Sequence, residues 1–313
     1  MTQTTANFAD RLLDAIEAKG SPVCVGIDPK YDQLPPALAT GAGPHGGPDA
    51  DASAQLARIG EFCWQVLEAV APHVPAVKPQ SAYFEAYGAG GVETYFQVVR
   101  WAHEFGLLVI GDAKRNDIGP TAEAYAAGHL AGPDKADSLT VNAYFGIDGL
   151  KPFLDVCSAE GKGAFALVRT SNRSAGQVQD FANAEGKKLY EHMAELVAGF
   201  GDAAGLVGRR GYSSLGAVVG ATWPQEARRL RQLMPRQIFL VPGYGSQGAS
   251  ASDCAACFKD DGTGAIVNAS RSVIYAHRQA QYAHLPWHKA VQQAAKAFAE
   301  DIKKAVTAVV RGS

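Results

Sequence analysis

A cluster of charged residues directly after an apolar run is the part of this sequence best suited to chemistry. Asp112, Lys114, Arg115 and Asp117 follow the run 107–111, which has the composition of a buried strand. Side chains alternate faces along a strand, so Asp112 and Lys114 point the same way, while Asp117 lies past the strand end where the next helix begins. Such charges are costly to bury unless they compensate one another. A functional site explains the pattern better than structural salt bridges, which usually join separate elements.

Two earlier apolar runs also end in ionisable side chains. Asp28 closes the first run of the chain and Lys78 closes the second. A lone lysine at a strand end is more often a solvated side chain. Two lysines interleaved with carboxylates on neighbouring strands are harder to explain in that way, because each amine would face an acid. We therefore expect both residues to share one cavity with Asp112, Lys114 and Asp117.

A second group of residues is suited to binding an anion. The turn 243–248 is rich in glycine and follows the seventh apolar run, and Ser270 and Arg271 follow the eighth. A glycine-rich turn exposes backbone N–H groups, and an arginine fork binds phosphate oxygens through two parallel hydrogen bonds. A flexible surface turn beside a solvated arginine is the alternative interpretation. Placed across the cavity from the charged cluster, the pattern favours a phosphorylated small molecule that spans both sides.

Eight short apolar runs recur along the chain, and each is followed by a segment of helical period. Several runs are continuous rather than alternating, which is typical of parallel strands covered on both faces. Eight strand–helix repeats predict an α/β fold, a (β/α)8 TIM barrel that forms a single domain over residues 1–313. A doubly wound open sheet is the alternative, disfavoured because no Gly-x-Gly-x-x-Gly turn follows the first run. The runs are 23–28, 75–80, 107–114, 138–143, 164–170, 215–222, 238–243 and 265–270.

Three segments extend the minimal barrel. Residues 29–52 are rich in proline and glycine and predict a long loop after the first strand, and residues 172–186 form a polar excursion after the fifth. Both are expected on the C-terminal face, where barrel enzymes carry their sites. A regular apolar spacing predicts a C-terminal helix over residues 287–310.

The composition argues against several classes of function. The chain has 313 residues, 47% of them hydrophobic, and a formal net charge of −2. This near-neutral balance argues against nucleic-acid and membrane-surface binding, and no apolar stretch reaches the ~18 residues that span a bilayer. Residues 1–19 have the pattern of an amphipathic helix rather than a signal peptide. Five cysteines, an odd number, argue against a disulfide framework. We therefore expect a cytoplasmic protein.

Five short stretches together form a recognisable pattern. They are CVGIDP at 24–29, VKPQSAYFE at 77–85, GDAKRNDI at 111–118, AVVGAT at 217–222 and VPGYGSQG at 241–248. With them the chain resembles the orotidine 5′-monophosphate decarboxylase family, and within it the longer bacterial subgroup. The Asp-x-Lys-x-x-Asp motif alone is shared with sugar-phosphate decarboxylases of the same superfamily. Together with Lys-Pro-Gln and the Gly-x-Gln-Gly turn it is specific, and the match covers the whole predicted barrel.

The resemblance implies a role for each residue of the charged cluster. Lys114 is similar to the family's proton donor, and Asp112 to the carboxylate that faces the departing CO2 group. Lys78 resembles the second lysine, which contacts the ribose and holds Asp112. Asp117 resembles an aspartate that crosses a dimer interface into the neighbouring site. The resemblance therefore implies a homodimer in which Asp117 is shared across the interface.

The resemblance also implies which residues hold the nucleotide. Asp28 is expected at the ribose, and Thr121 at the ribose or at the subunit boundary. Ser171 is expected at the pyrimidine, and Gln247 and Arg271 at the phosphate. Ser270 departs from the family, where many members have glycine, but a backbone N–H would bind phosphate with either residue.

The implied reaction converts orotidine 5′-monophosphate to uridine 5′-monophosphate and CO2, the last step of de novo pyrimidine synthesis, without a cofactor. A magnesium-dependent sugar-phosphate decarboxylase or aldolase is a close alternative. In that relative a glutamate at the second strand end helps to bind the metal. Here the position is Lys78, which repels a cation. We therefore expect no metal.

Two further alternatives belong to other classes. A Schiff-base aldolase could use Lys78 or Lys114, but the flanking carboxylates should keep both amines protonated. A catalytically silent phosphate-binding barrel could act as a sensor or scaffold, but it would have no need of the intact charge array. The sequence therefore predicts an enzyme that binds a small nucleotide and neither nucleic acid nor membrane.

Overall fold

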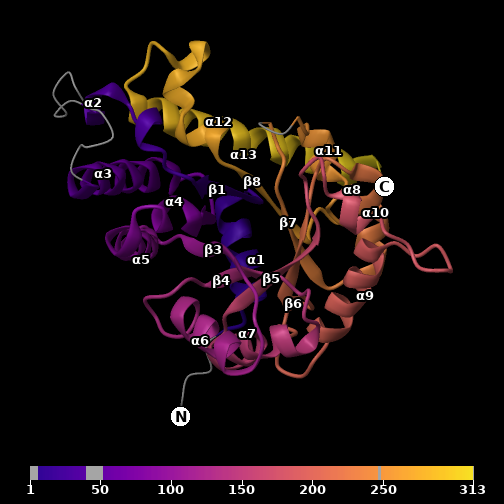
Figure 1. Cartoon of the computed structure of the whole chain (residues 1–313). Helices are drawn as coiled ribbons and strands as arrows, with labels where there is room; N and C mark the ends of the chain where they lie inside the picture. The colour runs from indigo at the N-terminus through magenta and orange to yellow at the C-terminus, as the bar shows by residue number, and fades with distance from the viewer. Residues whose placement is uncertain (1–5, 40–51, 246–247, 313) are drawn as a thin grey trace.

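Eight parallel strands close into a barrel in the computed structural model, which describes residues 6–39, 52–245 and 248–312. Each strand pairs with the next one along the chain, and the eighth pairs with the first. Helices surround the barrel on its outside (Figure 1). The predicted (β/α)8 fold is confirmed, and a doubly wound sheet is excluded because closure leaves no free edge strand.

Every strand coincides with one of the apolar runs expected from the sequence. These segments form strands because their continuous apolar side chains are covered on both faces, by the helices outside and by the barrel interior. The strands are β1 (Val23–Ile27), β2 (Ala76–Pro79), β3 (Leu108–Arg115), β4 (Ser138–Val141), β5 (Gly163–Arg169), β6 (Ser213–Val219), β7 (Gln237–Val241) and β8 (Ala265–Ala269).

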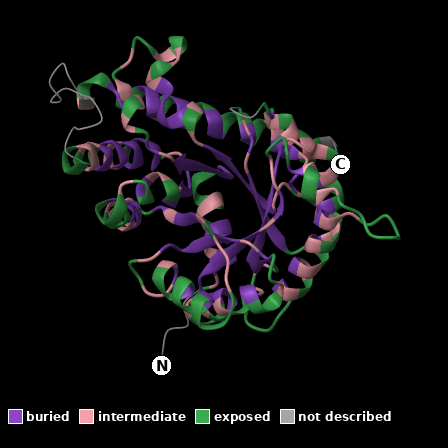
Figure 2. Ribbon diagram, viewed as in Figure 1, coloured by how far each residue is buried: buried purple, intermediate pink, exposed green. Residues whose placement is uncertain are grey.

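The helices bury one face against the barrel and expose the other, as the colouring of Figure 2 shows. The α-helices are α1 (Phe8–Lys19), α2 (Pro36–Ala39), α3 (Ala52–Val70), α4 (Ser81–Glu85), α5 (Gly88–Glu104), α6 (Gly119–His129), α7 (Ile147–Glu160), α8 (Gly176–Gln179), α9 (Leu189–Gly201), α10 (Pro224–Leu233), α11 (Ala251–Ala255), α12 (Arg271–Ile274) and α13 (Trp287–Gly312). The described residues also form three short 3-10 helices, η1 (Tyr31–Gln33), η2 (Ala276–Arg278) and η3 (Ala280–Tyr282).

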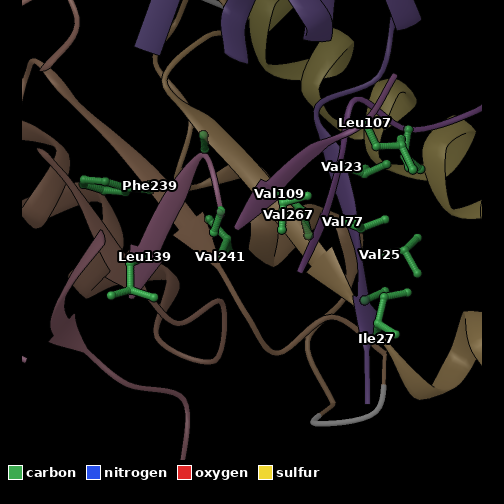
Figure 3. Close-up of a cluster of buried hydrophobic side chains, with 14 of the residues drawn as sticks. Val23, Val25, Ile27, Val77, Leu107, Val109, Leu139, Phe239, Val241 and Val267 are labelled. Atoms are coloured by element: carbon green, nitrogen blue, oxygen red, sulfur yellow. The ribbon is translucent and has the colours of Figure 1, made fainter. Parts of the chain in front are cut away.

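Alternation along the strands divides the apolar side chains into two layers. Val23, Val25 and Ile27 of β1 belong to the layer that packs against the helices, together with Val77 and Val109 (Figure 3). All of them are fully buried. This layer attaches the helical ring to the barrel.

The second layer fills the barrel interior and is closed at the amino ends of the strands by α1. Cys24, Ile110 and Phe165 belong to it, and Phe8 of α1 meets the ring of Phe165 edge-on at 6.0 Å. A Cβ at Gly163 would lie 2.2 Å from the Phe8 ring, so only glycine allows the helix to approach so closely. The interior is therefore a packed core, and a ligand can enter only from the other end.

The inward-facing layer continues toward the carboxyl ends of the strands as polar residues. Ala76 and Ile110 point inward, and two residues further along each strand stand Lys78 and Asp112. Lys78 pairs with Gly26 of β1, and a β-bridge joins Gln80 to Asp112. Strand alternation and parallel register therefore place the predicted charges at one end of the barrel interior.

The segments that extend the barrel contain short elements of their own. Within residues 29–52, η1 and α2 are formed, while residues 40–51 lie outside the described part of the chain. Within residues 172–186 the structure has α8, and α13 covers the helix expected over 287–310. In the described ranges we find no helix that is long and apolar enough to cross a membrane.

Candidate active site

A pocket of about 450 Å3 opens at the carboxyl ends of the strands. A larger groove of about 920 Å3 lies outside the barrel between α11 and α13. The predicted charged residues Lys78, Asp112 and Lys114 line the smaller pocket instead. Six of the predicted site residues line it together: Asp28, Lys78, Asp112, Lys114, Ser171 and Arg271.

Two lysines bind the two oxygens of one buried carboxylate. Lys78 Nζ donates to Asp112 Oδ2 at 2.6 Å, and Lys114 Nζ donates to Asp112 Oδ1 at 2.5 Å. The side chain of Lys78 is 8% exposed, whereas that of Lys114 is 47% exposed. Lys114 is therefore the amine that a ligand in the pocket can reach. Lys78 pairs with the same carboxylate from the buried side.

The pairing decides the charge state of the buried groups. Burial alone would raise the pKa of Asp112, but Lys78 and Lys114 outweigh it and hold that pKa well below its usual range. Burial would likewise lower the pKa of Lys78, yet the carboxylates of Asp112 and Asp28 raise it above its ordinary value. Asp112 and Lys78 are therefore both ionised at neutral pH.

The backbone at Lys114 departs from a regular strand. Its φ of 49° is the one positive value among described residues other than glycine, and the pairing of β3 with β4 shifts register between Gly111 and Arg115. Thr140 of β4 holds this geometry, because its Oγ1 accepts from Lys114 N at 3.0 Å and donates to Asp112 Oδ1 at 2.9 Å. Backbone conformations of this kind are costly and collect at functional sites, where a bulge re-aims a side chain.

Asp28 offers an unused acceptor to the pocket. Its Oδ1 is buried and has no hydrogen-bond partner among the residues that the structure describes. Its backbone is fixed by Tyr275, whose hydroxyl donates to Asp28 O at 3.0 Å and accepts from Lys30 N at 2.7 Å. A buried carboxylate oxygen without a donor is suited to accept a hydrogen bond from a ligand hydroxyl.

The structure describes part of the group of residues predicted to bind an anion. Arg271 is exposed at the start of α12 and lines the pocket, and the turn after β7 begins with Gly243 at φ 115°. Only glycine adopts such a conformation without strain. Gln247, the other expected phosphate ligand, lies outside the described residues.

Ser171 lies on the opposite wall of the pocket from β1, at the end of β5, with Thr170 and Asn172 beside it. Close packing against β6 fixes this segment. A Cβ at Gly220 would stand 2.9 Å from Ser171 Cα and 3.0 Å from its backbone nitrogen. Gly220 therefore allows the chain after β5 to lie directly on the end of β6.

Two predicted site residues do not line the pocket of a single chain. Asp117 is half-buried, and its Oδ1 accepts a hydrogen bond from Ile118 N at 2.9 Å, just before α6. Thr121 is exposed within the first turns of α6. The described chain therefore brings Lys78, Asp112 and Lys114 together with Asp28, Ser171 and Arg271 but leaves Asp117 and Thr121 outside the pocket.

Some pocket residues were missed by the sequence interpretation. Thr140 contacts both Asp112 and Lys114, and Asn268 of β8 accepts a hydrogen bond from the Cys24 thiol at 3.5 Å. Both face inward by the same alternation that places Asp112. That alternation, applied to every strand, would have found them.

The fold and the site define a (β/α)8-barrel enzyme that holds two lysines and an ionised aspartate at the carboxyl ends of its strands. The chain belongs to the orotidine 5′-phosphate decarboxylase / HUMPS family, whose model matches residues 21–284.

Relatives with assigned functions agree with this membership. The chain is 41% identical over 306 residues to the orotidine 5′-phosphate decarboxylase of Rhodopirellula baltica, covering 95% of this chain and 99% of that one. It is 36% identical over 310 residues to the enzyme of the same name from Caldicellulosiruptor bescii, covering 96% and 99%. Among solved structures, the orotidine monophosphate decarboxylase of Leishmania donovani matches with a TM-score of 0.73 at 30% identity, covering 96% and 99%.

Replacement of Lys78 by methionine tests the buried pairing. The variant leaves Asp112 Oδ2 without its donor and Lys114 as the one cation bound to the carboxylate, so the free energy of unfolding should fall by about 1–3 kcal/mol at neutral pH. The pKa of Asp112 should rise, and stability should then be lost at a higher pH on acidification. The sign follows from the pKa of Asp112, which is lower in the folded protein than in the unfolded chain. The ionised carboxylate therefore stabilises the fold at pH values above its unfolded-state pKa, and this stabilisation is lost as the pH falls through its folded-state pKa. Urea denaturation across a pH series measures both effects.

The same substitution in an Asp112→Asn background is the control. Without the buried charge, Lys78→Met should cost less than it does in the unmodified chain. An equal cost in both backgrounds would contradict the pairing, since it would mean that Lys78 acts only by filling space.

Proposed function

We propose that this chain removes CO2 from orotidine 5′-phosphate and yields uridine 5′-phosphate, the reaction that completes pyrimidine nucleotide synthesis. Membership of the family supports the reaction, and the observation that carries it is the Lys78–Asp112–Lys114 array in a pocket that also contains Arg271. A cytoplasmic location stays a prediction of the sequence.

The chemistry requires a cation at the carbon that loses its carboxylate. When the bond between C6 of the pyrimidine and the carboxylate breaks, CO2 leaves and the electron pair stays on C6 in the plane of the ring. An ammonium group held at C6 stabilises that charge and then gives C6 a proton. Lys114 is the accessible amine of the array, and we assign it both tasks.

Asp112 and Lys78 support this amine. Asp112 fixes Lys114 through the 2.5 Å ion pair and faces the substrate carboxylate, which favours departure of CO2. Lys78 compensates the charge of Asp112 from the buried side and lies close enough to Asp28 for that carboxylate to raise its pKa. The site is therefore organised before the substrate enters, so little reorganisation accompanies the reaction.

The rest of the pocket is assigned to the nucleotide. Asp28 accepts from a ribose hydroxyl through its unpaired Oδ1, and Ser171 contacts the pyrimidine from the far wall. Arg271 binds the phosphate, with Gln247 as a second ligand. Phosphate binding lies remote from C6, so its free energy can hold the substrate in the reactive position.

We also propose that the reaction proceeds without a metal. In the described part of the chain, no group of three or more His, Cys, Asp or Glu side chains is arranged to hold a metal ion. At the pocket, both oxygens of Asp112 are already occupied by ammonium groups, which repel a cation. The magnesium-dependent alternative therefore lacks a suitable ligand set in this pocket.

A chelator distinguishes the two possibilities. After dialysis against EDTA, the rate of orotidine 5′-phosphate loss, followed by ultraviolet absorbance, should equal the rate of untreated enzyme. Loss of activity that added magnesium restores would overturn the metal-free assignment. A metal-dependent enzyme treated in parallel confirms that the chelator was effective.

A Schiff-base aldolase is disfavoured by the charge state of the lysines. Such an enzyme needs a neutral amine as nucleophile, which burial or a neighbouring cation usually provides. Here Asp112 and Asp28 raise the pKa of Lys78, and Lys114 donates to Asp112. The raised pKa of Lys78 favours its ammonium form, and the amine of Lys114 is engaged in an ion pair with Asp112.

Substitution of Lys114 by alanine tests the proton-donor assignment. Without the amine, neither the developing charge at C6 nor its protonation is assisted, so turnover should fall by several orders of magnitude. The side chain is half exposed, so the variant should fold, which circular dichroism verifies. Substantial turnover in the folded variant would refute the assignment. Lys151→Ala, which removes an exposed lysine of α7, is the control and should keep full activity.

We further propose a homodimer in which Asp117 completes the site of the neighbouring subunit. Asp117 does not line the pocket of its own chain. A Cβ at Gly149 would lie 3.2 Å from the Asp117 carbonyl oxygen and 3.0 Å from Phe145 Cβ, and the ring of Phe145 meets that of Tyr144, so apolar side chains lie beside Asp117. Ile118 is 53% exposed, Tyr144 78% and Phe145 48%. Exposed apolar groups gathered in this way are typical of surfaces that bind protein. A second copy of the chain would bury them and receive Asp117.

A mixture of two inactive variants tests this arrangement. Asp117→Ala and Lys114→Ala homodimers each lack one required group in both sites. If Asp117 acts across the interface, a mixed dimer regains one intact site, and unfolding and refolding the variants together should restore about a quarter of the unmutated activity. No recovery, in a sample shown by native mass spectrometry to contain mixed dimers, would place Asp117 in its own subunit's site. Full activity of the Asp117→Ala variant by itself would place Asp117 outside the mechanism.

A further inference from the structure

Arg169, the last residue of β5, is a buried cation that the proposed mechanism does not use. Only 1% of its surface is exposed, and it has the largest side chain among the fully buried residues described. An arginine is almost never buried so completely unless its charge and its five N–H groups are matched. Its partners therefore indicate what the residue holds together.

These partners come from three segments that follow β5 and β6. Arg169 Nε donates to Glu226 Oε2 at 2.6 Å and Nη2 to Glu226 Oε1 at 3.3 Å, a two-bond pair with α10. Nη2 also lies 3.1 Å from Asp180 Oδ1, at the end of α8. The guanidinium packs against the rings of Trp223 at 4.6 Å and Tyr190 at 4.9 Å. One side chain therefore joins α8, α9 and α10.

A register shift explains why a charged side chain occurs here. The pairing of β5 with β6 shifts between Leu167 and Arg169. Leu167 packs against the interior layer, whereas Arg169, which strict alternation would also direct inward, lies among groups from the surrounding helices. The irregularity turns the guanidinium away from the barrel interior and places it directly before the pocket residues Thr170 and Ser171.

Gln179 of α8 connects Arg169 to the pocket wall. Its Oε1 accepts from Arg169 Nη1 at 3.5 Å and from Thr170 N at 3.0 Å, and its Nε2 donates to Thr170 Oγ1 at 2.7 Å. The indole of Trp223 donates to Thr170 O at 3.1 Å. The backbone N–H, the carbonyl and the hydroxyl of Thr170 are therefore all bound by residues that contact Arg169.

We propose that Arg169 is a positioning residue that sets the pyrimidine side of the pocket. It fastens α8 and the connection between β6 and α10 to the end of β5, and these segments in turn fix residues 170–172, which line the pocket. Arg169 itself does not line the pocket. The inference rests on the proposed function in one respect, that the ligand side facing Ser171 is the base of a nucleotide.

This position predicts a selective effect on the ligand. Residues 170–172 face the base, whereas the phosphate is assigned to Arg271 on the other wall. Loosening the segment should therefore weaken contacts to the base and leave contacts to the sugar phosphate intact. A general loss of packing would weaken both.

Arg231 provides a matched control. It is half-buried and lies against an aromatic ring, 3.5 Å from the centroid of Phe239. It donates to Gln237 O and Gly264 O, both at 2.7 Å, at the amino ends of β7 and β8. Arg169 and Arg231 thus share hydrogen-bonded, ring-packed guanidinium groups but occupy opposite ends of the barrel.

The experiment compares Arg169→Met and Gln179→Ala with the controls Arg231→Met and Gln177→Ala. Gln179→Ala cuts the link to Thr170 without leaving a buried charge unpaired, so it keeps the test available if Arg169→Met does not fold. Gln177 is exposed on the same short helix. Decarboxylation kinetics and calorimetric binding of uridine 5′-phosphate and of ribose 5-phosphate are measured for each folded variant.

We expect kcat/KM for orotidine 5′-phosphate and affinity for uridine 5′-phosphate to fall by about tenfold or more in Arg169→Met and Gln179→Ala. Ribose 5-phosphate affinity should stay within about twofold, and both controls should match the unmutated enzyme in all three. Equal weakening of the binding of both ligands, or an unchanged Gln179→Ala variant, would overturn the positioning role of Arg169 and leave the proposed function intact. An unmutated chain that neither turns over orotidine 5′-phosphate nor binds uridine 5′-phosphate would instead reject the proposed function, and the inference with it.

Discussion

An ionised carboxylate inside a barrel must have both of its oxygens satisfied, and the arrangement of this molecule around Asp112 follows from that constraint. Lys78 comes from the strand on one side and Thr140 from the strand on the other, while Lys114 comes from β3 itself through a residue with positive φ. The parallel pairing of β3 with its two neighbours brings these strand ends to one point. The same contacts that make the buried charge tolerable also aim an accessible amine into the pocket.

The pocket is divided by chemistry. The ends of β1, β2 and β3 supply the charges, and β4 supplies Thr140, which holds them. Arg271 after β8 is the proposed phosphate ligand, and the residues after β5 form the wall proposed to face the base. Each part is fixed by a residue that does not itself react: Thr140 holds the charged array, and Tyr275 holds the backbone of Asp28. Positioning of this kind lets a reaction without an electron-accepting cofactor depend on electrostatics alone.

Particular residues show how far the sequence could predict the site. The strands were predictable because their apolar runs are continuous, and Lys78 and Asp112 were predictable because charges at strand ends require compensation. Thr140 was not recognised, since a threonine in an apolar strand is common and only its neighbours reveal its two hydrogen bonds. Arg169 could not be placed at all, because a register shift between two strands decides which side it faces. Asp117 and Thr121 do not line the pocket of their own chain. Their place in a site was predicted only from the resemblance to a family, because the sequence of one chain does not show which residues a second chain receives.

A crystal structure of the chain with uridine 5′-phosphate bound tests the central claim most directly, because the product keeps the C6 atom that the reaction protonates. The account predicts Lys114 Nζ within about 3–3.5 Å of C6 while it retains its contact with Asp112, and the phosphate at Arg271. A nucleotide bound with the base turned away, or Lys114 directed into solvent while Asp112 pairs with Lys78 alone, would contradict it.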